Sequence, residues 1–87
     1  MGQPSRQDHL IVHELDQEIL LYDPQANRSH RLNQSASLIW QMCDGVRSVE
    51  EIAGLMTERY EVSFEAALQD TRQVIRQMAD EHILSPA

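Results

Sequence analysis

The first third of the chain alternates short apolar runs with polar turns, a pattern typical of β-strands. It predicts three strands, over residues 9–15, 18–22 and 29–32. Asp16 and Gln17 suit a two-residue turn between the first two, and Pro24 suits the turn that follows. Residues 1–8 are polar and include a proline, so we expect a loose, flexible tail there.

From Asn33 onward, apolar residues recur at helical spacing. Asn33 is a good N-cap for a helix over residues 34–43, and Gly45 is placed to end it in a left-handed conformation. Ser48 and Glu51 form a capping box for a second helix that runs to about residue 60. Ser63 caps a third, over residues 64–81. The inward side chains expected from this spacing are Ala36, Ile39, Trp40 and Cys43, then Ile52, Leu55, Met56 and Tyr60, and finally Ala67, Leu68, Thr71, Val74, Ile75 and Met78.

The predicted order is three strands followed by three helices. This is an α+β fold, a three-stranded antiparallel sheet and then three helices, which resembles a winged helix with its sheet placed first. Ile83 and Leu84 should pack the end of the chain back onto the core. We expect residues 9–87 to form a single domain, because 87 residues suffice for one modest core and leave no room for a deep catalytic cleft.

The charge of the chain argues against two classes of partner. Fourteen Asp and Glu face seven basic residues, all of them arginine, for a net charge of −7. Such a surface repels the phosphates of nucleic acids and of anionic membranes. The third helix, which would enter the groove of DNA in a winged-helix protein, itself carries more acidic than basic residues. No apolar run reaches membrane-spanning length and no signal-peptide core is present, so we expect a cytoplasmic protein.

The sequence offers little catalytic or metal-binding chemistry. The single Cys43 closes an apolar helical stripe and should behave as a buried hydrophobic residue. His9 and His13 would lie about 13 Å apart in a strand, too far to bind one ion. His30 and His82 are distant in sequence. We therefore expect no catalytic residue, no metal site and no cofactor.

The third predicted strand is an edge that is both short and polar. Such an edge can accept an extended peptide by strand addition, or it can simply remain solvated. The residues by themselves leave both interpretations open.

The stretch LNQSASLIWQMCDG, residues 32–45, is similar to the PqqD family, named from pyrroloquinoline quinone biosynthesis. The residues that match its pattern are Leu32, Asn33, Ser35, Ala36, Ile39, Trp40, Asp44, Gly45, Ser48, Val49, Glu51 and Ile52, with Asp70, Val74, Ile75 and Met78 in the third helix. The resemblance covers residues 9–84. It departs from the family at His82, where a glycine is usual.

The resemblance implies a recognition module for precursor peptides that are made on the ribosome and then modified. Such a module binds the leader segment as a strand beside the third strand and against the third helix. It delivers the leader to a modifying enzyme, such as a radical SAM enzyme or a leader protease. The alternatives are a winged-helix DNA-binding protein and a structural subunit of another complex. Monomer and strand-exchanged dimer both remain open.

The same resemblance implies a peptide-binding site with two sides. Val74 would form the apolar wall, and Asp70 and Gln77 its polar ends, although an ordinary helix surface is the alternative for the polar residues. The expected site residues are Ser29, His30, Arg31 and Leu32 on the third strand, and Asp70, Gln73, Val74 and Gln77 on the third helix.

Overall fold

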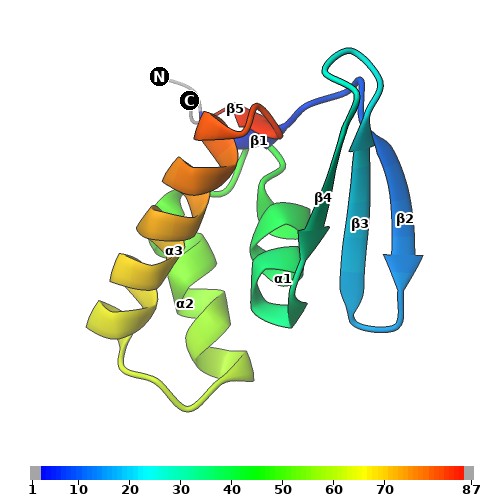
Figure 1. Cartoon of the computed structure of the whole chain (residues 1–87). Coiled ribbons are helices and arrows are strands. Elements are labelled where there is room, and N and C mark those ends of the chain that lie inside the picture. The colour runs from blue at the N-terminus through cyan, green and yellow to red at the C-terminus, as the bar shows by residue number, and fades with distance from the viewer. Residues whose placement is uncertain (1–2, 86–87) are drawn as a thin grey trace.

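The computed structural model describes residues 3–85, so residues 1–2 of the expected tail and residues 86–87 of the expected domain lie outside it. Three antiparallel strands, in the order β2-β3-β4, form one sheet, and three helices lie on one side of it, with α1 in contact with β3 and β4 (Figure 1). The strands are β2 (Ile11–Leu15), β3 (Glu18–Asp23) and β4 (Arg28–Leu32), and the helices are α1 (Gln34–Met42), α2 (Val49–Arg59) and α3 (Phe64–Asp80). The predicted α+β architecture is confirmed.

Both predicted turns of the sheet are present. Leu15 pairs with Glu18, so Asp16 and Gln17 form a two-residue hairpin turn, in which Asp16 takes a left-handed φ of 45°. In the second turn, the carboxylate of Asp23 accepts hydrogen bonds from the backbone N–H groups of Gln25 and Ala26, at 2.9 and 3.2 Å. Local hydrogen bonds of this kind explain why these residues reverse the chain.

The core lies between the helix-facing side of the sheet and the inward stripes of the helices. Strand β3 alternates half-buried and buried residues, with Ile19 and Leu21 pointing to the helices. All three predicted N-caps accept a backbone hydrogen bond in the first turn of their helix, and Ser48 and Glu51 complete the capping box. Of the side chains expected to point inward, most are buried; Ala36, Leu55, Tyr60, Leu68 and Val74 are half-buried.

The N-terminal segment differs from the loose tail expected over residues 1–8. Strand β1 (Ser5–Arg6) pairs with β5 (Leu84–Ser85), and Pro4 is fully buried. The Gly45 N–H donates to the Pro4 carbonyl at 2.9 Å. This pairing depends on a partner at the opposite end of the sequence, which local polarity does not reveal.

Two left-handed residues end helices on the same side of the molecule. Gly45 follows α1 with a φ of 82°, as expected for a glycine that stops a helix. His82 follows α3 with a φ of 62°. Glycine adopts this conformation without steric cost, whereas His82 carries a Cβ and is strained there.

The last residues return to the core as predicted. Ile83 and Leu84 are almost completely buried, and the indole N–H of Trp40 donates to the Ile83 carbonyl at 3.2 Å. Among the helices within residues 3–85, none combines the length and apolar character needed to cross a membrane.

Candidate functional site: the β4 edge and the groove beside α3

Among the strands within residues 3–85, none pairs with the outer side of β4, where Ser29 and Arg31 supply the free backbone groups. The Ile19 N–H points toward β4, where it donates to the Ser37 hydroxyl at 3.0 Å, and that hydroxyl donates to the Leu32 carbonyl at 3.0 Å. Antiparallel pairs alternate between bonded and non-bonded positions, so Leu32, His30 and Arg28 face β3. Ser29 and Arg31 therefore direct their N–H and C=O groups to the open edge.

A groove of about 370 Å³ runs along this edge, between β4 and α3. Leu32, Ala36, Val74 and Met78 give it an apolar lining. The full set of lining residues is Ser29, His30, Arg31, Leu32, Asn33, Ser35, Ala36, Val74, Gln77, Met78 and Glu81. The groove thus combines free backbone groups with side-chain walls, the two elements that strand addition requires.

Six of the eight residues expected from sequence line this groove. They are Ser29, His30, Arg31, Leu32, Val74 and Gln77. Asp70 and Gln73 are exposed on α3 and do not line it. Residues 74, 77, 78 and 81 form one helical stripe; Asp70 lies a full turn before Val74 on that stripe, and Gln73 is rotated away from it.

Five residues that line the groove were not expected there from the sequence: Asn33, Ser35, Ala36, Met78 and Glu81. The first three belong to the start of α1, which follows β4 without a loop. Glu81 lies seven residues after Val74, which puts it on the same stripe. The sequence contained a signal for each group of residues. The junction of strand and helix without a loop indicated the residues near α1, and the helical spacing from Val74 indicated Glu81.

The side chains of Arg31 and His30 point to opposite faces of the sheet. Arg31 points to the outer face of the sheet, where its guanidinium donates twice to Glu18, at 3.0 and 2.8 Å. His30 points to the helices, with its Nδ1 3.6 Å from the Glu81 carboxylate. The Nε2 of His30 is buried and finds no hydrogen-bond partner among the described residues.

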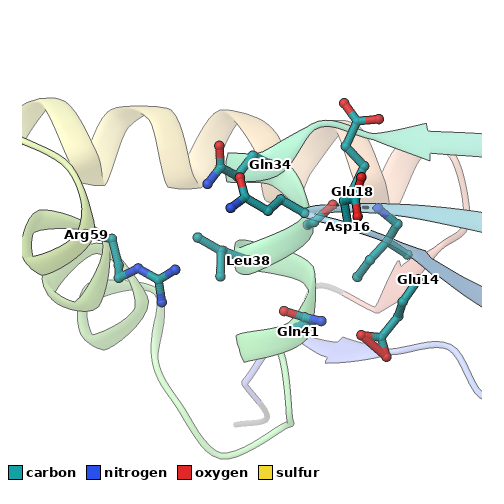
Figure 2. A pocket seen from close by; sticks show the side chains of 10 residues that line it. Glu14, Asp16, Glu18, Gln34, Leu38, Gln41 and Arg59 are labelled. Atoms are coloured by element: carbon teal, nitrogen blue, oxygen red, sulfur yellow. Dashed lines mark hydrogen bonds between the residues drawn. The ribbon is translucent and has the colours of Figure 1, made fainter.

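A second cavity, of about 180 Å³, lies beside the β2–β3 turn (Figure 2). Leu38 and Gln41 line it from α1, and Arg59 extends from α2 toward Leu38. Three carboxylates line its other side, from Glu14, Asp16 and Glu18. This cavity has a smaller volume and a more acidic lining than the groove beside β4.

The side chains with catalytic or metal-binding potential are held in structural roles. Cys43 is buried, and burial raises the pKa of its thiol to about 12, so it stays protonated. His9 contacts the Asp23 carboxylate at 3.2 Å. Across residues 3–85, no group of three His, Cys, Asp or Glu side chains comes together as a metal site.

The model of the family described as "Coenzyme PQQ synthesis protein D (PqqD)" matches residues 18–84, well over half of the chain. The chain belongs to the PqqD family. The match starts at β3 and ends in β5, so it includes β4, α3 and the groove between them. No curated protein matches the chain in sequence.

Solved structures of other proteins have a fold similar to that of this chain. TbiB1, in complex with the TbiA(beta) leader peptide, aligns with a TM-score of 0.86 at 23% identity, over 95% of this chain and 96% of that one. Lasso peptide synthetase B1, also complexed with a leader peptide, aligns at 0.85 and 23%, over 97% and 99%. The heterocyclase TruD aligns at 0.67 and 17%, and this PqqD-family chain corresponds to only 11% of its length.

Proposed function

We propose that this protein binds the leader segment of a ribosomally synthesised precursor peptide by strand addition to β4 and delivers it to a modifying enzyme. The observation that carries the proposal is the open edge of β4 with a groove alongside it, in a member of the PqqD family. Two proteins with nearly superimposable folds have been solved with leader peptides bound.

The geometry of β4 sets how much affinity the backbone can contribute. Ser29 and Arg31 each offer one N–H and one C=O, so an added strand makes about four hydrogen bonds of about 0.5–1.5 kcal/mol each. Ordering the peptide opposes this gain of about 2–6 kcal/mol. Side chains in the groove must supply the remaining affinity and all of the selectivity.

Val74 is the residue best suited to select an apolar peptide side chain. It is half-buried on α3 and lines the groove together with Met78 and Leu32. Ser29, His30 and Arg31 form the strand side of the site, and Gln77 provides a polar contact on the helix side. Asp70 and Gln73 would contact only a peptide that extends beyond the groove.

The protein acts here as a non-catalytic module. Its one cysteine is a protonated, buried thiol, and its histidines contact carboxylates or lie on the surface. The same fold makes up 11% of the heterocyclase chains it resembles, so it occurs within larger modifying enzymes. The chemistry would therefore come from an enzyme such as a radical SAM protein or a leader protease, with the module acting in the cytoplasm.

Calorimetry tests the proposal with a synthetic leader peptide, taken from any short precursor gene found beside the gene for this protein. Saturable one-to-one binding is expected, with duplex DNA showing none at low salt, where electrostatic binding is strongest. Salt-sensitive DNA binding without leader binding would overturn the proposal in favour of a winged-helix DNA-binding role.

A further inference from the structure

A strand added beside β4 would direct every second side chain into the groove. His30 pairs with the buried Leu21 in the sheet, so its side chain lies on the helix-facing side, as does that of Leu32. Two peptide side chains, about 6.6 Å apart along the strand, would therefore enter the groove. One would lie near Leu32 and the other near His30.

The two ends of the groove differ in chemistry. Glu81 lies 3.6 Å from His30, so α3 and β4 run in opposite directions along the groove. Glu81 therefore lies at the His30 end, and Val74 lies toward the Leu32 end. The Leu32 end has apolar walls from Val74 and Ala36, alongside the polar Asn33 and Ser35. The His30 end presents the Glu81 carboxylate, whose side chain is 42% exposed.

The negative potential at the His30 end has two sources. Asp80 and Glu81 stand where α3 ends, and α3, which is described along its whole length, has no basic residue in its last turn. The helix dipole adds partial negative charge at that terminus. Arg28 shares the adjoining hollow with Asp80 and Glu81, whereas Arg31 is bonded to Glu18 on the outer face of the sheet.

His30 provides a second and independent indication of a ligand. Its side chain is about nine-tenths buried, it lines the groove, and its Nε2 finds no hydrogen-bond partner among the described residues. With the proton on Nδ1, facing Glu81, the Nε2 atom is an acceptor. A cationic group that contacts Glu81 could also donate to His30 once the ring turns so that this free acceptor faces the groove.

We propose that the groove selects a peptide strand with an apolar side chain beside Val74 and, two residues away, a lysine or arginine whose head group contacts Glu81 and His30. This inference rests on the proposed function and names the class of sequence that the site takes. The aliphatic stem of either cation would pack on Met78, and its head would meet the carboxylate.

Selection from a library of random twelve-residue peptides tests this proposal on three immobilised proteins: the wild type, Glu81→Lys and Glu58→Lys. Glu58 is exposed on α2 outside the groove, so its replacement matches the change in net charge. The wild type and Glu58→Lys should enrich an apolar residue two positions from a basic one. Glu81→Lys should enrich an acidic residue at that position, and wild-type peptides should bind it about tenfold more weakly.

The selected peptides separate this inference from the proposed function. Each is measured again on Arg31→Pro, which removes a backbone donor from the edge, with circular dichroism as the control for folding. Peptides that need the β4 edge but show no basic preference, or keep it on Glu81→Lys, would overturn the inference alone. Failure to select any peptide that depends on the edge would overturn both.

Discussion

The sheet has two open edges, β2 and β4, which offer the same backbone groups in different surroundings. All five residues of β2 are exposed, including the apolar Ile11, Val12 and Leu15, and β2 lies on the side of the sheet away from α3 (Figure 1). Strand β4 has α3 alongside it and a groove of about 370 Å³ between them.

This difference shows what makes a strand edge selective. Backbone hydrogen bonds are available at any edge and do not distinguish one peptide sequence from another. Only the β4 edge adds walls that contact alternate side chains of an incoming strand. A cavity that reaches β2 at Glu14 has an acidic lining and lies beside the hairpin turn.

The largest expected effect concerns the core that supports both edges. Trp40 is 5% exposed and bonds to the Ile83 carbonyl, so Trp40→Ala should lower the free energy of unfolding by about 3–5 kcal/mol. Urea unfolding measures this loss. A loss below about 1 kcal/mol would mean that α1 does not bury this face.

One proline substitution in β4 and one in β2 compare the two sheet edges directly. Arg31→Pro removes an N–H that faces the open side of β4, and we expect leader binding to weaken at least about a hundredfold, or about 2.7 kcal/mol. Glu14 pairs with Ile19 at a non-bonded position, so its N–H faces the open side of β2. Glu14→Pro is the matched control and should bind like the wild type in calorimetry. Equal losses in the two variants would remove the distinction between the edges.

A charge placed in each cavity tests the side-chain walls. Val74→Asp puts a carboxylate against the apolar part of the groove and should weaken leader binding by about 2 kcal/mol, or about thirtyfold. Leu38 is also half-buried, and it lines the cavity near the hairpin turn. Leu38→Asp should leave affinity unchanged, with circular dichroism confirming that both variants fold. A folded Val74 variant with wild-type affinity would place the site elsewhere.

The smallest effect concerns a residue remote from both edges. Gly45→Ala should cost about 1 kcal/mol in stability, because alanine is strained at a φ of 82°. An added Cβ would lie 3.5 Å from the Cβ of Ser5, an ordinary contact, so the cost comes from the backbone. Thermal unfolding measures the loss, and leader affinity should not change. Weaker leader binding would show that this end of the molecule belongs to the site.

Local sequence signals predicted most of the fold. The caps at Asn33, Ser48 and Ser63 and the turn at Asp16 depend on residues close together in the chain. The pairing of β1 with β5 joins residues about 80 positions apart and has no local signal. Ser37 was also not anticipated as a bridge between β3 and β4, because a serine on a helix gives no indication of a partner in a sheet.

The candidate site was predictable in part for the same reason. Helical spacing placed Val74 and Gln77 on the stripe that lines the groove, and the edge strand supplied Ser29 and Arg31. Where the groove ends along α3 depends on how the helix crosses β4. That crossing leaves Asp70 outside the groove and brings Glu81 next to His30.

The most direct test of the central claim measures amide hydrogen exchange, residue by residue, with and without the leader peptide. An added strand at β4 should protect the amides of Ser29 and Arg31 and leave those of Val12 and Glu14 exchanging as in the free protein. Protection at Val12 and Glu14 without protection at Ser29 and Arg31 would contradict the account.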